Sequence, residues 1–285
     1  MENDKVNEAA TGLTPEEVDH FIKHGYVLLR NAFSTDTAAA CREFLWARIE
    51  QDGVKQDDCS TWPEKHWISE SYSDATGEPW TEVLTPRLKS AMDQLCGKDR
   101  WNESDLVCGW WVITFPGHAM LPWGPAGHWH VDGAHYIHKL DSKESGLLPI
   151  FIFSDINPGD GGTALAPGSH MHVAHILQDA IPHGGLKGGK VSASAKSWVY
   201  QHKKAWVEVQ GRAGDIMLTH PFLMHARSKN CGSQVRFMCN PNVGLKDPMQ
   251  FERDDPADYS PVEAAIVEAL RQPVSQKKRK RGLHY

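Results

Sequence analysis

The sequence lacks the features that mark membrane and secreted proteins. It has no run of about 18 apolar residues, which is the length that a transmembrane helix needs. Its polar start, from Met1 to Lys5, has neither the basic nor the apolar part of a secretory signal. The six cysteines include no C-x-x-C pair, which argues for free thiols in a reducing compartment. We therefore expect a cytoplasmic protein that is neither secreted nor bound to a membrane.

Charge is spread unevenly along the chain. The net charge is −6, and because the run Lys277–Arg281 carries +5, the remainder carries −6 − 5 = −11. An acidic body argues against a broad nucleic-acid surface, so we do not expect a nucleic-acid partner. The basic run itself is either a nuclear-import signal or a solvated end. The second interpretation is favoured because short basic runs are common.

The chain is long enough to bury one large core. Its 285 residues, 40% hydrophobic and 23% charged, are typical of a globular protein. We expect a disordered N-terminus over residues 1–12, a single domain over 13–271 and a basic, disordered tail over 272–285. Within the domain, a helical layer (13–97) precedes a β core (106–240).

Helix signals mark the N-terminal part and one C-terminal segment. Thr14 and Glu17 have the spacing of a capping box, Pro15 suits the first helical position, and Gly25 suits the end of the helix. The polar, irregular stretch over 57–82 predicts a long loop. Similar signals predict further helices from Ser34 to about Gln51, from Thr85-Pro86 to Gly97 and over Pro261–Leu270. Between Gly97 and the last of these we find no helical periodicity.

Short apolar segments, separated by Gly, Pro, Asn and Asp, dominate the second half of the chain. Many short strands with such punctuation predict a sandwich or barrel. We therefore predict a mainly β protein with flanking helices, in which an N-terminal helical layer covers a β-barrel or jelly roll. The predicted strands are Tyr26–Leu29, Leu106–Phe115, His128–Val131, Leu147–Phe153, Trp206–Val209, Ile216–Leu218 and Val235–Asn240.

One of these segments has the spacing of a metal site. His130 and Asp132 are two residues apart, and on a strand such residues project from the same face. An imidazole from a distant strand would complete two histidines and one carboxylate, which leaves three positions of iron(II) open for a 2-oxo acid and oxygen. The His-x-Asp triplet alone is weak evidence for a metal site, because sixteen histidines give roughly one such triplet by chance. His128 shares the face of His130, and we favour a place at the pocket rim over a fourth ligand.

The C-terminal half contains candidates for the second imidazole and a basic residue that could bind a 2-oxo acid. His220 and His225 both follow a predicted strand and are alternatives for the second imidazole. Arg236 stands on the next predicted strand, where burying a cation is costly unless it binds an anion. Its planar guanidinium suits the distal carboxylate of a dicarboxylate. The remaining histidine pair, His172 and His175, is interpreted as packing or solvated.

Four segments, in this order, resemble the phytanoyl-CoA dioxygenase family of iron(II)/2-oxoglutarate oxygenases. They are Leu13–Val27, His128–Gly133, Gly161–His170 and the series Gly214-Asp215, His225, Asn230 and Arg236. The resemblance implies a double-stranded β-helix (jelly-roll or cupin-like) core. It also implies His130, Asp132 and His225 as iron ligands, Arg236 as the 2-oxoglutarate anchor and Tyr136 as a residue lining the pocket. The family spacing of eleven residues to Arg236 favours His225 as the distal ligand.

The reaction implied by the resemblance is an oxidation that consumes 2-oxoglutarate and O2 and yields succinate and CO2. Hydroxylation of an unactivated C–H bond in a small organic substrate is favoured, because related halogenating enzymes replace the carboxylate that Asp132 supplies here. Desaturation and cyclisation stay open, as do the substrate and the oligomeric state. Two rival functions are a cupin-like metalloenzyme that does not use 2-oxoglutarate and a catalytically silent jelly-roll binding module. Arg236 argues against the first, and the intact triad argues against the second.

Overall fold

The computed structural model describes residues 12–71, 77–106 and 110–272. Residues 1–11 of the predicted disordered N-terminus and 273–285 of the predicted basic tail, with the run Lys277–Arg281, lie outside the described residues. The described cysteines are free thiols, as expected. In this part of the chain, no helix combines the length and the apolar character needed to cross a membrane.

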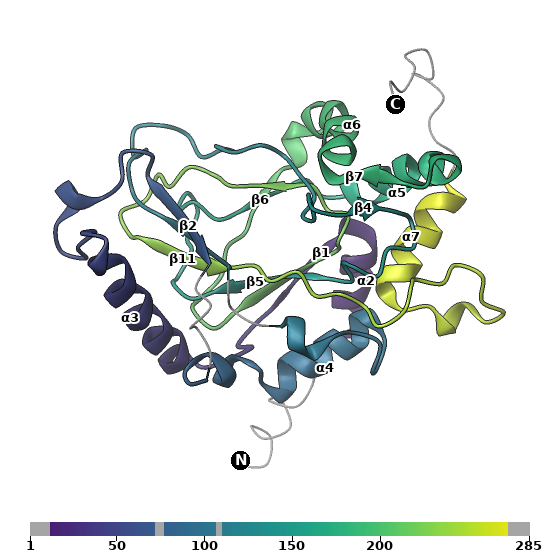
Figure 1. Ribbon diagram of the computed structural model, residues 1–285, viewed down its shortest axis with the longest axis horizontal. Coiled ribbons are helices and arrows are strands. Elements are labelled where there is room, and N and C mark those ends of the chain that lie inside the picture. The colour runs from purple at the N-terminus through teal and green to yellow at the C-terminus, as the bar shows by residue number, and fades with distance from the viewer. Residues whose placement is uncertain (1–11, 72–76, 107–109, 273–285) are drawn as a thin grey trace.

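A six-stranded antiparallel sheet forms the larger wall of the fold (Figure 1). Its middle strands β9, β5 and β11 are completely buried, and all of their residues except Thr219 and Arg236 are apolar. In spatial order the strands are β1 (Tyr26–Leu29), β9 (Ile216–Thr219), β5 (Leu148–Ile152), β11 (Arg236–Cys239), β3 (Trp110–Thr114) and β2 (Trp67–Ser71).

A smaller antiparallel sheet carries the segment on which the predicted metal motif stands. Isolated bridges join Pro125 to Ser228 and His130 to His225, so this segment runs beside β10. The prediction of a mainly β core with flanking helices is confirmed, and the structure shows that its sheets are antiparallel. The small sheet has the order β10 (His225–Ala226), β6 (Ala164–Leu165) and β8 (Val207–Glu208), and a further pair is formed by β4 (Ile137–His138) and β7 (Leu186–Lys187).

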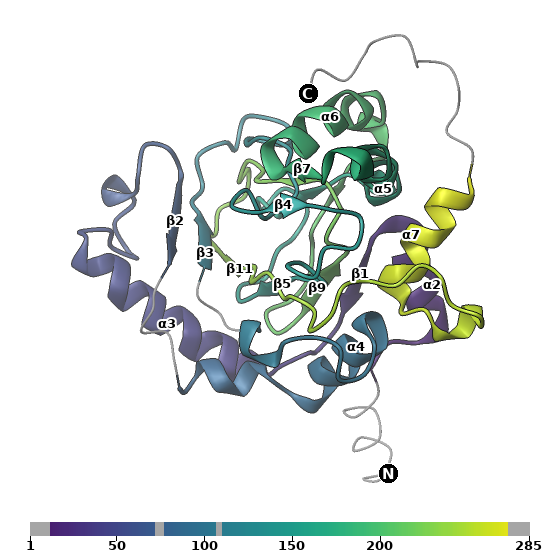
Figure 2. The same cartoon turned by 45° about the vertical axis from the view of Figure 1, so that its right-hand side comes forward.

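The four predicted helices form where their capping residues stand. Thr14 and Glu17 make the expected capping box, and Ser260 makes a second one with Glu263. Ser34 and Thr85 each accept a backbone N–H of the first turn that follows. Both views place α3 and α4 along one side of the molecule (Figures 1 and 2). These helices are α2 (Pro15–His24), α3 (Thr35–Gln51), α4 (Pro86–Cys96) and α7 (Pro261–Arg271).

Two further helices were not predicted. The expectation that helical periodicity returns only at the last helix is wrong, because α5 (Ser169–Ala180) and α6 (Gly188–Gln201) precede it. Neither has a side-chain cap at its N-terminus, and α6 begins with two glycines, which disfavour a helix. Both gain their stability from packing, since α5 contacts α6 and α7. Figures 1 and 2 show the pair opposite α3 and α4.

The long loop predicted over 57–82 contains an edge strand. Strand β2 pairs with β3, but its half-exposed residues show no apolar alternation, so the sequence pattern did not reveal it. In contrast, the predicted strand His128–Val131 is reduced to the single bridge at His130. Short 3-10 helices complete the fold at η1 (Cys59–Thr61), η2 (Trp80–Val83), η3 (Glu103–Asp105), η4 (Ile181–His183), η5 (Lys203–Ala205) and η6 (Pro256–Asp258).

Candidate metal centre

The two histidines of the site are neighbours across the smaller sheet. The backbone N–H of His130 donates to the carbonyl of His225 at 2.9 Å, and that of His225 donates back to His130 at 2.9 Å. Residues paired in this way in an antiparallel ladder project their side chains to the same face. The imidazole ring centroids consequently lie 4.4 Å apart. Strand pairing thus joins two residues that are distant in the sequence.

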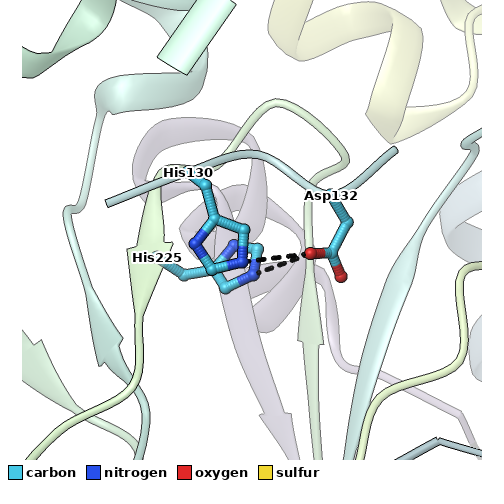
Figure 3. A group of neighbouring side chains, drawn as sticks. All are labelled: His130, Asp132 and His225. Carbon is cyan, nitrogen blue, oxygen red and sulfur yellow. Dashed lines mark ion pairs between the residues drawn. The ribbon is translucent and has the colours of Figure 1, made fainter. Parts of the chain in front are cut away.

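Asp132 completes the cluster, on the same side of the chain as His130. Its Oδ1 lies 3.2 Å from Nε2 of His130 and 3.4 Å from Nε2 of His225, and Figure 3 shows both rings directed at that one oxygen. One donor atom from each side chain lies within 4.8 Å of the others. Within the described ranges, no other three His, Cys, Asp or Glu side chains are so arranged.

Both imidazoles are oriented by backbone carbonyls. Nδ1 of His130 lies 2.8 Å from the carbonyl of His128, and Nδ1 of His225 lies 3.1 Å from that of Leu223. A carbonyl only accepts, so each Nδ1 carries a proton, and in the neutral form of each ring Nε2 keeps its lone pair. Nε2 of His225 is buried and has no hydrogen-bond partner. The two lone pairs therefore face the cluster, as metal ligation requires.

The carboxylate of Asp132 is ionised. Burial alone would raise its pKa, but the neighbouring imidazoles of His225 and His130 hold the pKa well below its usual value. For His130, burial lowers the pKa while the hydrogen bond and charge of Asp132 raise it, and the net pKa is raised. Nδ2 of Asn240 donates to Oδ2 of Asp132 at 3.2 Å, which leaves Oδ1 to the two imidazoles.

Arg236 is a buried cation with unused donors. Its side chain is 1% exposed, and one terminal nitrogen donates to the Thr114 hydroxyl on the paired strand. Its Nε and Nη1 are buried without a hydrogen-bond partner, and no described acidic residue forms an ion pair with it. Burial, and then the charge of Arg227, lower the pKa of Arg236 to about 9. Such a group is stable only if an anion satisfies it.

One strand connects this arginine with the histidine cluster. Arg236 begins β11, and Asn240 follows directly after the strand ends at Cys239. Side chains four residues apart on a strand share a face. Arg236 therefore faces the same side as the amide that contacts Asp132. Sequence reasoning missed Asn240, although its even spacing from Arg236 on a predicted strand was a usable signal.

The structure separates the other predicted residues from the cluster. His220 is buried with Nε2 3.2 Å from the Val262 carbonyl, and its Nδ1 accepts the N–H of Phe222 at 3.1 Å. Both of its ring nitrogens are thus engaged elsewhere. His172 stacks on Trp198, with centroids 5.6 Å apart, and packs as expected.

Tyr136 lies beside the segment that carries Asp132. A Cβ added to Gly133 would come within 2.2 Å of the Tyr136 ring, so glycine is what lets the ring approach the backbone. The ring also stacks on His138 at 4.3 Å. Burial raises the pKa of the Tyr136 hydroxyl to about 12, so the phenol is neutral.

A groove of about 470 Å³ opens beside His130 and Asp132. One wall is the backbone from His128 to Ala134, and His128 is exposed there. The other wall is α6, which the sequence did not predict. Its lining residues on that helix are Gly188, Gly189, Ser192, Ala193 and Lys196.

Comparisons with known proteins give one family match and several structures of similar fold. The family model described as phytanoyl-CoA dioxygenase matches residues 21–238. Among solved structures, EctD from S. alaskensis with bound Fe is 18% identical with a TM-score of 0.52, covering 85% of this chain and 82% of that chain. The apo form of EctD is 16% identical with a TM-score of 0.50, covering 86% of each chain. These likenesses bear on the fold and support the double-stranded β-helix.

A third similar structure has a lower TM-score. HygX from Streptomyces hygroscopicus with nickel and 2-oxoglutarate bound is 15% identical with a TM-score of 0.49, covering 82% of this chain and 88% of that chain. A search of the curated proteins finds no match.

Proposed function

The chain belongs to the phytanoyl-CoA dioxygenase family, and we propose that His130, Asp132 and His225 hold its iron(II) while Arg236 anchors its 2-oxoglutarate. The protein is accordingly a non-haem enzyme that uses iron(II), 2-oxoglutarate and O2. The observation that carries the residue assignments is the convergence of the three donor atoms beside a groove.

The donor set fits iron(II). Two neutral imidazoles and one carboxylate on one side of a metal leave three positions open for co-substrate and oxygen. The unpartnered Nε2 of His225 and the Oδ1 of Asp132, 3.4 Å away, are converging donor atoms. An iron ion would satisfy both.

The surroundings of Arg236 fit a carboxylate. The end of the guanidinium, formed by the unpartnered Nη1 and the second N–H of Nη2, matches a carboxylate in bidentate fashion. The Thr114 hydroxyl accepts a hydrogen bond from the other N–H of Nη2, which fixes the plane of the guanidinium. We propose that the distal carboxylate of 2-oxoglutarate binds here. Tyr136, beside Asp132, is proposed to border the same pocket.

The proposed reaction is hydroxylation of a C–H bond in a small molecule. Iron and 2-oxoglutarate together supply the oxidising power, as RH, 2-oxoglutarate and O2 become ROH, succinate and CO2. The protein orients the imidazoles through the carbonyls of His128 and Leu223 and the carboxylate through Asn240. Asp132 fills the position that a halide would need, which favours hydroxylation over halogenation.

We propose further that residues 13–271 act as one oxygenase domain, which works in the cytoplasm and has no nucleic-acid partner. The family model covers most of that range. Nuclear import through Lys277–Arg281 is the alternative location, and a fluorescent fusion with and without that run distinguishes the two.

The proposal is tested by anaerobic visible absorbance. Metal-free protein is titrated with iron(II) and then with 2-oxoglutarate, and we expect a weak charge-transfer band. Asp132→Ala should abolish the band, while Arg236→Ala should weaken 2-oxoglutarate binding by about 30-fold or more, because a buried charge pair loses one partner. Arg212→Ala is the matched control, since Arg212 is exposed and pairs with Asp155.

A second pair of variants tests the choice of histidine. His225→Ala should lose iron affinity, and His220→Ala should keep it. The reverse result would overturn the assignment of the distal ligand. If wild-type protein gives no band and calorimetry detects no 2-oxoglutarate binding, the assignment of both sites is wrong.

A further inference from the structure

Helix α6 is docked against the segment that carries Asp132. A Cβ on Gly188 would stand 2.9 Å from the carbonyl oxygen of Gly133, so the helix start touches the residue after Asp132. One turn later, the Ser192 hydroxyl accepts the backbone N–H of Val131 at 3.3 Å and donates to the Gly188 carbonyl at 2.9 Å. The groove beside the metal centre therefore has two walls that are hydrogen-bonded to each other.

The wall formed by α6 is built from small side chains near the metal centre. Gly189 has no atom within 4 Å of the position that a Cβ would occupy, so it borders open space. Ser192 and Ala193 continue this surface along the groove. Small residues at these positions leave room for the body of a ligand next to His130 and Asp132.

The segment that contains α6 is basic. Between Asp179 and Glu208 the chain has five lysines, at 187, 190, 196, 203 and 204, and no acidic residue, although the whole chain has a net charge of −6. Lys196 lines the groove, is exposed, and forms no ion pair with any described residue. An unpaired cation at the end of a groove attracts an anionic group.

We propose that the substrate of this enzyme is a small organic anion whose carboxylate or phosphate group binds Lys196. The proposal rests on the proposed function, because the reacting carbon must lie beside the ligands His130 and Asp132. Gly188 abuts the residue after Asp132, and Lys196 stands eight positions after Gly188, which is about 12 Å along the helix axis. The proposed substrate therefore extends along the groove from the metal ligands to this lysine.

Binding to the enzyme loaded with iron(II) and saturating 2-oxoglutarate, without oxygen, tests the charge preference. The probes are four molecules of equal chain length, namely octanoate, octyl phosphate, octan-1-ol and octylamine, and calorimetry measures their affinity. Saturating 2-oxoglutarate keeps Arg236 occupied, so a probe cannot bind there. We expect at least one anion to bind more tightly than the alcohol and the amine. Equal binding of all four, binding of the amine alone, or no binding would overturn the proposal.

Variants of α6 locate the contact. Lys196→Ala should weaken anion binding about fivefold to tenfold, as expected for one exposed charge pair, without changing the affinity for the alcohol. Lys190→Ala removes the same charge from the same helix, about a third of a turn away round its axis, and should change anion affinity less than twofold. Equal effects of the two variants would mean that the helix attracts anions through its overall positive charge rather than through a contact with Lys196, and would contradict the proposal.

A third variant tests the route through the groove. Gly189→Val places a side chain in the open space of the groove, where it meets no other atom of the protein. It should lower the affinity of every probe that binds wild type. The charge-transfer band with 2-oxoglutarate should persist in all three variants. A wild-type enzyme that shows the band but no preference for anions refutes only the substrate class, whereas absence of the band in wild type refutes the proposed function itself.

Discussion

Each proposed metal ligand is held by a second group. Nδ1 of His130 and Nδ1 of His225 both bond to the carbonyl two residues earlier, and Asn240 donates to Asp132. Such supporting contacts fix tautomer and rotamer before a metal arrives, which lowers the entropic cost of ligation. Of the three supports, the Asn240 amide is the one that a point mutation can remove without altering the backbone.

Asn240→Ala should therefore weaken iron(II) binding by about 10- to 100-fold, the usual effect of losing a contact behind a ligand. Anaerobic calorimetric titration of the metal-free protein measures it. Asn242→Ala is a suitable control, because Asn242 bonds instead to the Glu144 carbonyl and to Ser145. Unchanged iron affinity in Asn240→Ala would show that the contact with Asp132 has no role in positioning.

Among the elements, α7 packs against α2, α4 and α5 and also carries one buried carboxylate. The Glu263 side chain is 0% exposed and pairs with Arg100 and Arg253. It also accepts the backbone N–H groups of Gln250 and Ser260. Burial would raise the pKa of Glu263, but the hydrogen bond from Arg100 and the backbone donors lower it to about 2. The carboxylate is thus more acidic in the folded state than in the unfolded chain.

The stability that Glu263 contributes should depend on pH with a definite sign. A depressed folded-state pKa gives a contribution that is complete above about pH 4.5 and is lost as the pH falls towards 2. Glu263→Gln should lower the free energy of unfolding by about 3 kcal/mol at pH 7, because it leaves Arg100 partly unpaired. Urea unfolding of the metal-free protein from pH 7 to pH 3 should show this difference shrinking below about pH 4.5.

Glu268→Gln is the matched control for this measurement. Glu268 is exposed on the same helix, where it accepts a hydrogen bond from Gln272, so its loss should change stability by less than about 0.5 kcal/mol. A difference between wild type and Glu263→Gln that stays constant down to pH 3 would contradict the ion-pair interpretation.

At the scale of the whole molecule, the proposed ligand groups come from both sheets. His130 and His225 stand on the smaller sheet, while Arg236 starts a central strand of the larger one. Iron(II) and 2-oxoglutarate together would therefore connect the two walls. A ligand that binds only the folded state raises its stability, by about 2.7 kcal/mol at 100 times the dissociation constant.

Anaerobic thermal unfolding should show this coupling in two steps. Iron(II) and then 2-oxoglutarate should each raise the melting temperature, by on the order of 5 to 10 °C at 100 times the dissociation constant. Asp132→Ala should lose both steps, and Arg236→Ala only the second. If Arg236→Ala keeps the full second step, the anchor for 2-oxoglutarate lies elsewhere.

The sequence by itself determined the features that depend on residues close together in the chain. Thr14, Ser34 and Ser260 cap the helices that they predict, because capping needs only a side chain and an N–H three residues later. The spacing of His130 and Asp132 likewise places both on one side of an extended chain. The family resemblance extended this local knowledge to His225 and Arg236.

Only the tertiary structure decided which distant segments meet. The pairing of His130 with His225 depends on backbone hydrogen bonds between strands, which no local pattern encodes. Helix α6 carries no cap and starts with glycines, so packing against α5 rather than local propensity maintains it. Lys196 could not be assigned to the groove until that helix was placed beside Asp132. Local rules describe neighbours within a turn or a strand, whereas the site is built from long-range packing.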